Sequence, residues 1–322
     1  MILLRDIEDR GYPMDYLLAR IHGRRAFLLK DWEKVLFSPD ISGYLMSTRY
    51  SKFISEYQAD GIRRRYQEEL QWMYYQMNKK LRLIFGPCFM YAELGTVLTC
   101  LRYHLKKGKK TEIEYILAFS LLSERVMNIL SLEADLPFIL EMLDKRAAFL
   151  SDSPAGLSDI FLTGGLPKVE QTITRTQLEH IMNEPGHPCI TRFFISLIDS
   201  INIITLYKHL RWGISAKPAF ITGGNVKGPV LSAIFHSRDV SEITGLIQKQ
   251  TGFYVGEPTA ASIESALLKG ISGQVKKMEG ESPDIGLILN YLWRSSLEAR
   301  DISILYYGNK IDKDIIREEL VH

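Results

Sequence analysis

The sequence predicts an all-helical protein built from copies of one helical unit. Three segments share a layout in which an acid comes first, a polar residue follows three positions later, and an apolar run ends at a glycine. The acids are Glu93, Asp199 and Glu298, the polar residues are Thr96, Asn202 and Asp301, and the glycines are Gly108, Gly213 and Gly308. A fourth copy begins at Tyr16, and successive copies start roughly 100 residues apart, a repetition that decides the architecture.

Apolar spacing supports the helical interpretation. Residues 193–212 are apolar almost all round, so we expect neighbouring helices to cover this segment on most sides. Long helices are also expected at 62–85, ending at Gly86-Pro87, and at 262–278. Gly108 and Gly213 stand where helix C-terminal caps are expected. In the segment after Glu93, the apolar residues fall on one helical face: Leu94, Val97, Leu98, Leu101 and Leu105.

Strand signals are weak, because no long alternating run and no Asn-Gly or Asp-Gly hairpin with strand-like flanks is present. Two irregular connectors are expected, at 152–169 and 217–229, which contain the similar stretches FLTGGL and FITGGN. Residues 279–283 are expected to form an exposed loop.

Composition and charge narrow the class of protein. The chain has 322 residues, 46% hydrophobic and 24% charged, which argues against disorder, and a net charge of +2, which argues against bulk nucleic acid as a partner. The scattered cysteines, Cys88, Cys100 and Cys189, fit a reducing compartment. The N-terminus does not resemble a secretory signal. The most apolar stretch, 190–210, is interrupted by charges, so we predict no membrane span.

The spacing of acids and bases within the repeat is informative. Arg102 follows Glu93, and Lys208 follows Asp199, by nine positions, which places each pair on opposite helix faces, about 13 Å apart along the axis. Asp199 and Asn202 share a face. We interpret each helix as presenting an acid to one neighbour and a base to another. Ordinary solvated charges are the main alternative, and catalysis is a remote one.

Other motifs favour ordinary structure over chemistry. Residues 223–228 are glycine-rich, but they lack the glycine spacing and the Lys-Ser/Thr pair of a phosphate loop, so a turn before a helix is expected. A small group of potential metal ligands fits a loop better than a metal site: His180, Glu184, His187 and Cys189. No nucleophile–base set is apparent, so neither a catalytic residue, a metal nor a cofactor is predicted.

Two basic clusters have structural and functional interpretations. Arg63, Arg64 and Arg65 precede Glu68 and Glu69 in a predicted helix, which favours a solvated, salt-bridged face. The second cluster ends a helix, where lysines favour the negative end of the dipole. Contact with lipid headgroups or an acidic partner is the alternative for these lysines: Lys106, Lys107, Lys109 and Lys110.

Patches along nearly the whole chain resemble one family. The clearest are Glu298-x-Arg300-Asp301-Ile302, Asp199-x-x-Asn202-Ile203, Phe220-Ile221-Thr222-Gly223-Gly224 and Tyr16-Leu17-x-Ala19-Arg20. They are similar to the C subunit of archaeal and bacterial V/A-type rotary ATPases, called subunit d in eukaryotic vacuolar enzymes. The chain resembles a divergent member, with Ser295-Ser296 where the family usually has Lys-Glu.

The resemblance implies three similar helical bundles around a pseudo-threefold axis, forming a funnel with a central cavity. The expected bundles are residues 1–90, completed by about 285–322, then 91–190 and 191–284. The residues expected to form the structural signature of the repeat are Arg20, Glu93, Arg102, Asp199, Asn202, Lys208, Glu298, Arg300 and Asp301.

The function implied by the resemblance is that of a non-catalytic central-rotor adaptor. Such an adaptor couples the central stalk, subunits D and F, to the membrane proteolipid ring during ATP-linked proton or sodium transport, with the membrane stator subunit as a further partner. It would be peripheral, on the cytoplasmic side of the membrane, and would bind no nucleic acid. A generic all-helical repeat scaffold for protein–protein interaction is the alternative, although known 30–50-residue solenoid signatures are absent. An enzyme is the third class.

Overall fold

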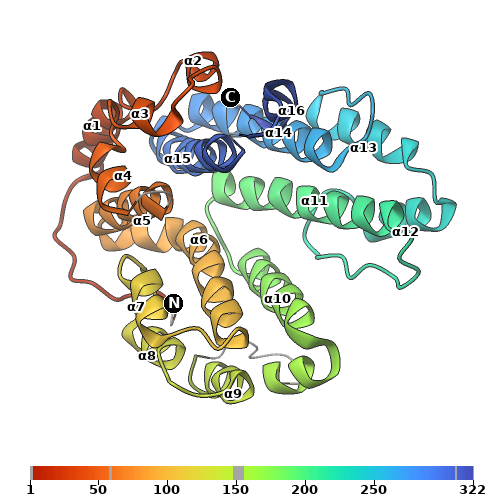
Figure 1. Cartoon of the computed structure of the whole chain (residues 1–322), viewed down its shortest axis with the longest axis horizontal. Coiled ribbons are helices and arrows are strands. Elements are labelled where there is room, and N and C mark those ends of the chain that lie inside the picture. Colours follow the sequence, from red (N-terminus) through yellow and green to blue (C-terminus); the bar gives the residue numbers. More distant parts are fainter. Residues whose placement is uncertain (1–2, 58–59, 148–155, 309, 322) are drawn as a thin grey trace. The chain divides into compact units, whose positions relative to one another are not determined.

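The computed structural model describes residues 3–57, 60–147, 156–308 and 310–321, and every named element in these ranges is a helix (Figure 1). An isolated antiparallel bridge joins Leu4 to Leu122. The all-helical fold class is therefore confirmed. The helices are α1 (Met14–Arg25), α2 (Trp32–Leu36), α3 (Ile41–Leu45), α4 (Ser51–Tyr57), α5 (Asp60–Gln76), α6 (Lys79–Leu105), α7 (Lys110–Leu117), α8 (Glu124–Leu130), α9 (Leu136–Ala147), α10 (Leu157–Asn183), α11 (Pro188–Arg211), α12 (Gly228–Ser237), α13 (Ser241–Thr251), α14 (Ala260–Glu281), α15 (Pro283–Tyr307) and α16 (Lys313–Glu319).

The chain forms two compact units. Unit 1 contains Leu70–Gly186 together with the N-terminal stretch up to Tyr12, and unit 2 contains Pro13–Glu69 together with the chain from His187 onwards. Each unit therefore combines segments that are far apart in the sequence. The three-bundle boundaries expected from the sequence stay a prediction.

In unit 1, α6 packs against α10, and α9 packs against both α10 and α8. Phe85 and Phe89 of α6 are fully buried, and the ring of Phe89 lies 5.1 Å from that of Tyr74 in an edge-on contact. The N-terminal stretch lies along the connector between α7 and α8, where the Arg5 amide donates to the Leu121 carbonyl and the Ser123 amide donates to the Leu3 carbonyl.

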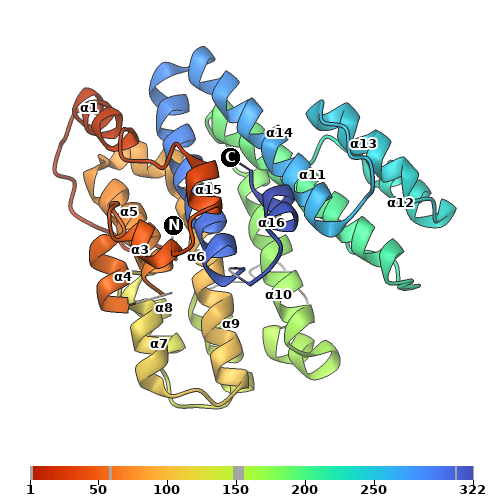
Figure 2. The same ribbon diagram turned by 45° about the horizontal axis from the view of Figure 1, so that its top comes forward.

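Unit 2 is organised around α14, which packs against α11, α13, α15 and α16 (Figure 2). One apolar core joins the N-terminal helices to α15 and α16 through residues such as Tyr50, Ile302 and Ile316. A second core joins α11, α12, α13 and α14 through residues such as Leu206 and Ile263. The first core explains why unit 2 combines Pro13–Glu69 with the C-terminal part of the chain.

Local capping sets helix boundaries that apolar spacing missed. The expected helix at 62–85 is wrong, because α5 ends at Gln76 and α6 begins at Lys79. The Asn78 side chain accepts a hydrogen bond from the Leu81 amide and so caps α6. Pro87 lies inside α6, where it removes the bond to the carbonyl of Leu83, a residue that is 65% exposed. The helix expected at 262–278 is confirmed as α14, which begins at a Thr259 cap.

Of the two connectors expected from the sequence, one is confirmed and the other is largely wrong. Residues 217–227 are irregular as predicted, and α12 then begins at Gly228. The connector expected at 152–169 is wrong from Leu157 onwards, because α10 occupies this region and bends at Gly165, where φ is 68°; residues 152–155 lie outside the described ranges. The loop expected at 279–283 is also wrong, since only Ser282 separates α14 from α15.

Helix ends show which glycines terminate helices. Gly213 has a left-handed φ of 62° and follows α11, as predicted. After α6 it is Lys107 that adopts the left-handed conformation, with φ of 54°, and the amide of Gly108 closes the turn by donating to the Tyr103 carbonyl. The left-handed cap of α6 is therefore Lys107, one residue before the expected Gly108. A left-handed lysine is strained, because its Cβ crowds the following carbonyl.

In the part of the chain that the structure describes, two helices, α6 and α11, are long and apolar enough to cross a membrane, and an 18-residue window in each has a mean hydropathy of 1.4 and 1.6 respectively. Of the apolar window in each, 50% and 61% is buried inside the protein. Core helices of globular proteins pass the same test of length and composition. We interpret both as core helices, because each also carries a buried acid bonded to a loop, as described below.

The turn between α14 and α15 predicts a stability effect at Gly286. A Cβ there would lie 2.4 Å from the Met278 carbonyl oxygen and 2.6 Å from the Cα of Glu279, so Gly286→Ala should lower the free energy of unfolding by about 1–3 kcal/mol, measured by urea denaturation. Gly273→Ala on α14 is the control, since nothing lies within 4 Å of its Cβ position and alanine favours a helix by up to about 1 kcal/mol. Equal effects at both positions would contradict the close approach.

Candidate functional site

The three repeated acids are buried in the long helices α6, α11 and α15. Glu93 is 3% exposed, Asp199 is 4% exposed and Glu298 is 1% exposed. A buried carboxylate costs several kcal/mol unless hydrogen bonds and opposite charges offset its lost hydration. The partners of each acid therefore reveal what the repeat holds in place.

Glu93 holds the connector between α7 and α8 in unit 1. Its two carboxylate oxygens accept hydrogen bonds from the Ser120 hydroxyl at 2.8 Å and the Leu121 amide at 2.7 Å. The carbonyl of Leu121 accepts from the Arg5 amide, so the same residue is bonded to both the helix and the N-terminal stretch. Thr96, one turn along α6, is also buried.

Asp199 holds the glycine-rich connector before α12 in unit 2. Its oxygens accept from the backbone amides of Asn225 at 3.1 Å and Val226 at 2.9 Å. A Cβ at Gly224 would lie 2.2 Å from the Asp199 carboxylate, so only glycine permits this close approach. The glycine pair thus has a packing role, in agreement with the expected turn. Burial raises the pKa of Asp199, although the amides of Val226 and Asn225 oppose that shift.

Asn202 adds a second tie to the same connector. Its side-chain oxygen accepts from the Ile221 amide at 2.8 Å, and its side-chain nitrogen donates to the Ile221 carbonyl at 2.9 Å. The amide therefore pairs with Ile221 as a neighbouring strand would. One turn separates the two ties on α11, which fixes both the position and the direction of the connector.

Glu298 joins α15 to the N-terminal segment of unit 2. One oxygen accepts from the Leu29 amide at 2.8 Å. The other accepts from the Arg49 guanidinium at 2.6 Å and the Tyr50 hydroxyl at 2.8 Å. Burial raises the pKa of Tyr50 well above its usual value, and the Glu298 charge adds to that shift. This acid has a cation as well as neutral donors.

Asp301 and Arg300 extend the contacts of α15 to the C-terminal segment. Asp301 accepts from the Val321 amide at 3.0 Å and from Arg300 at 2.8 Å. Arg300 also bridges to Glu264 on α14 at 3.0 Å. Asp301 and Asn202 occupy equivalent positions in the repeat. Each accepts a hydrogen bond from a backbone amide that lies later in the sequence than its own helix.

Arg300 pairs with an acid of the proposed signature, Asp301, whereas the other three bases of the signature lie apart from its acids. Arg102 pairs with Glu170 of α10 at 2.7 Å, which agrees with the expected contact to a neighbouring helix. Lys208 is exposed. Arg20 donates to the Tyr16 hydroxyl at 3.0 Å within α1. The structure thus brings the acids to loop backbones, and among the described residues it does not pair Asp199 with a base on a neighbouring helix.

The sequence analysis missed a buried ionic cluster around Glu69 in unit 2. Glu69 contacts Arg24 at 2.7 Å, Arg65 at 2.5 Å and the Tyr291 hydroxyl at 2.7 Å. Burial alone would raise the pKa of Glu69, but Arg65, Tyr291 and Arg24 outweigh it and the pKa is lowered. The solvated face expected for this part of α5 is wrong, since Arg64, Arg65 and Glu69 are all buried. Only the spacing of Arg65 and Glu69 by four residues signals this cluster in the sequence.

The remaining motifs form local structure. The His187 ring caps α11 by accepting from the Cys189 amide, and His180 lies 3.3 Å from Glu184. Within the described residues, no group of three or more His, Cys, Asp or Glu side chains is placed to hold a metal ion. The four lysines at the end of α6 are exposed.

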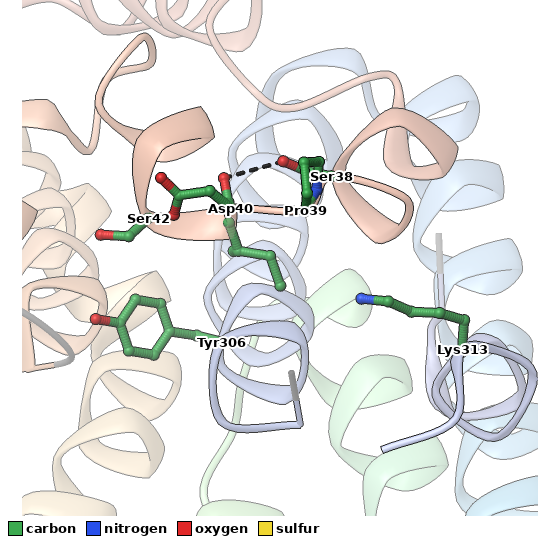
Figure 3. A pocket seen from close by; sticks show the side chains of 7 residues that line it. Ser38, Pro39, Asp40, Ser42, Tyr306 and Lys313 are labelled. Atoms are coloured by element: carbon green, nitrogen blue, oxygen red, sulfur yellow. Dashed lines mark hydrogen bonds between the residues drawn. The ribbon is translucent and has the colours of Figure 1, made fainter. Parts of the chain in front are cut away.

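One cavity of about 180 Å³ lies between the α2–α3 connection, α15 and α16 (Figure 3). It is smaller than the roughly 300–1,000 Å³ of typical ligand sites. Asp40 at its wall caps α3 by accepting from the Gly43 amide at 2.9 Å, and its carbonyl accepts from the Ser38 hydroxyl at 2.9 Å. Its lining residues are Ser38, Pro39, Asp40, Ile41, Ser42, Tyr306 and Lys313.

These features define a helical protein whose buried polar groups hold connectors against long helices. The sequence model of one protein family, described as ATP synthase (C/AC39) subunit, matches residues 17–319. The chain therefore belongs to the ATP synthase (C/AC39) subunit family, the C or d subunit of V/A-type ATPases. Members are peripheral structural subunits of an ATPase complex and are generally non-catalytic. Comparison with curated proteins finds no match.

Removing the Asp199 carboxylate tests its role as a connector support. Asp199→Ala leaves the amides of Asn225 and Val226 without their acceptor, and each buried unsatisfied amide costs about 1–3 kcal/mol, so the free energy of unfolding should fall by at least that amount. Lys208→Glu, at an exposed position nine residues later, should change it by less than about 0.5 kcal/mol. A large effect at Lys208, measured by denaturant unfolding, would instead indicate a charge pair.

The lowered pKa of Glu69 predicts a pH dependence. A carboxyl group whose pKa is lower in the folded state stabilises the protein fully above its unfolded pKa of 4.5, and this contribution is lost as the pH falls through the folded value. The difference in unfolding free energy between the wild type and Glu69→Gln should therefore be constant above about pH 5.5 and shrink below pH 4.5. Glu68→Gln, which removes a neighbouring carboxylate that is 42% exposed, is the matched control for the loss of one negative charge from α5.

Proposed function

We propose that this chain is the non-catalytic adaptor of the central rotor in a V/A-type ATPase. It couples the central stalk, subunits D and F, to the membrane proteolipid ring during ATP-linked proton or sodium transport. The observation that carries the proposal is the family match over residues 17–319, which leaves little of the chain for another activity. The chain would act as a peripheral subunit on the cytoplasmic side of the membrane, next to the stator subunit.

Three similar bundles around a pseudo-threefold axis, forming a funnel, are part of the proposal. Residues 91–190 and 191–284 form two of them, and the third consists of 1–90 completed by about 285–322. The spacing of hydrogen-bonded pairs supports the repeat: Leu121 follows Glu93 by 28 residues and Val226 follows Asp199 by 27. Ile221 follows Asn202 by 19 residues, and Val321 follows Asp301 by 20.

The contacts of Glu298 support the assignment of both chain ends to one bundle. In the other two copies the acid is bonded to a connector that follows it in the sequence. For Glu298 the corresponding amide belongs to Leu29, 269 residues earlier, and α2 begins three residues after it, just as α8 begins three residues after Leu121. The N-terminal segment thus supplies to α15 the amide that the following connectors supply to the acids of α6 and α11.

The buried contacts suit a part that transmits torque. Such a part must deform little under load, and this depends on fixed connectors and packed helices more than on reactive groups. Buried hydrogen-bonded carboxylates favour one arrangement of the backbone, because any displacement leaves a charge without its partners. The exposed lysines after α6 would contact an acidic surface of the ring or the stator: Lys106, Lys107, Lys109 and Lys110.

Copurification tests the proposal. The tagged chain, coexpressed with subunits D and F and the proteolipid ring, should bring down both in mild detergent. Vesicles that carry the holoenzyme without this chain should lose ATP-driven ion transport while the detached head still hydrolyses ATP. Recovery of neither partner, or unchanged transport without the chain, would refute the adaptor role.

Charge reversal tests the contact of the lysine cluster. Lys106→Glu/Lys107→Glu should weaken association with the ring or the stator and leave association with subunits D and F intact, because reversal removes two attractive charges and adds two repulsive ones. Lys276→Glu/Lys277→Glu, at exposed positions on α14, is the matched control in the same copurification measurement. Equal losses in both variants would show that the position of the cluster is irrelevant.

A further inference from the structure

Charge is distributed unevenly along this nearly neutral chain. The chain has 40 basic and 38 acidic residues, yet the stretch between Asp199 and Asp239 contains no acid. Its five cationic residues are Lys208, Arg211, Lys217, Lys227 and Arg238. The stretch covers the C-terminal half of α11, the glycine-rich connector and α12, so one end of α11 is cationic without a counter-charge in its own segment.

The end of α11 exposes a tryptophan beside these cations. The chain reverses at Gly213, where the Ile214 amide donates to the His209 carbonyl at 2.9 Å and the Gly213 amide donates to the Leu210 carbonyl at 3.2 Å. These two bonds form a Schellman motif, which fixes the turn. Trp212 lies on it and is 67% exposed, whereas Trp32 and Trp293 are each 8% exposed.

Arg238 joins this surface from the end of α12, which packs against α11 (Figure 1). Its guanidinium donates to the Ile214 carbonyl at 3.2 Å and stacks on the Phe235 ring at 4.5 Å. We call Lys208, Arg211, Trp212 and Arg238 the α11 tip. The Schellman turn and the bond from Arg238 to the Ile214 carbonyl fix the backbone of the tip, so its cations and its aromatic ring start from fixed positions.

We propose that the α11 tip binds an anionic lipid surface, with Trp212 at the level of the headgroups. Tryptophan favours this level because its ring is apolar and its N–H is polar. Cations near an anionic membrane strengthen binding by about fivefold each. The acids next in sequence are Asp239, which accepts a hydrogen bond from the Ser241 amide at 2.8 Å, and Glu242, so the tip keeps four cationic or aromatic residues against two exposed acids around the start of α13.

The shape of the tip favours lipid over an acidic protein. A stable protein partner needs about 800 Å² of fitted surface on each side. The tip is a helix end with one projecting ring, which offers little such area, whereas a membrane accommodates a single projecting aromatic side chain within its headgroup layer. The inference goes beyond the proposed function, because it concerns lipid and does not require any ATPase subunit.

Vesicle binding by the purified full-length chain tests the proposal. The chain should cosediment with mixed phosphatidylcholine–phosphatidylserine vesicles, bind weakly to phosphatidylcholine alone, and lose binding as salt is raised. Binding should shift the tryptophan emission to shorter wavelength, and Trp212→Phe should abolish the shift. Lys208→Gln/Arg211→Gln removes two charges, each worth about fivefold, and should therefore lower the partition coefficient of the protein onto the vesicles by about 25-fold.

Two controls separate the tip from general effects. Lys276→Gln/Lys277→Gln removes two exposed charges from α14, and Phe27→Ala removes an aromatic ring that is 69% exposed; both variants should bind as the wild type does. Circular dichroism should show unchanged helicity in every variant. Absence of vesicle binding, equal binding to neutral vesicles, or equal losses in the controls would overturn the proposal. Binding to soluble polyglutamate in preference to vesicles, independent of Trp212, would also overturn it and assign the tip to an acidic polypeptide.

Discussion

The hydrogen bonds from loop amides to buried carboxylates are the interaction on which the rest of the structure depends. A carboxylate removed from water is costly, and that cost is offset only while its oxygens keep their donors. Glu93 uses a hydroxyl and an amide, Asp199 uses two amides, and Glu298 adds a cation and a phenol. The same arrangement, a buried carboxylate on a long helix bonded to a connector, therefore occurs with three chemically different sets of donors.

The sequence predicted the acids and the helical class but not the partners of the acids. Repetition identifies Glu93, Asp199 and Glu298 without any structure, because the same spacing recurs. Their donors are mostly backbone amides, which every residue except proline carries, so no letter of the sequence marks them. Gly224 is the exception, since its missing Cβ makes room for the Asp199 carboxylate. The nine-residue spacing of acids and bases therefore predicts side-chain partners, whereas the acids in fact bind mostly backbone amides.

The boundary between α5 and α6 depends on a local cap, and the Glu69 cluster depends on contacts between residues far apart in the sequence. Asn78 ends one helix pattern and starts another within a continuous apolar stretch, and periodicity cannot resolve a break of two residues. Glu69 and Tyr291 are 222 residues apart in the sequence, so their contact follows from tertiary packing alone. Membership of the family, by contrast, follows from scattered motifs, because patches over nearly the whole chain retain it.

The bond between Leu29 and Glu298 has a consequence for biosynthesis. Translation delivers the N-terminal helices first, and the carboxylate that completes their surroundings is made 269 residues later. At usual elongation rates this interval is on the order of tens of seconds. During that time the apolar faces of α2 and α3 lack α15 and α16, the helices that cover them in the finished protein. The nascent chain therefore exposes apolar surface until α15 is made, and ribosomes that stop before α15 would release a product prone to aggregation.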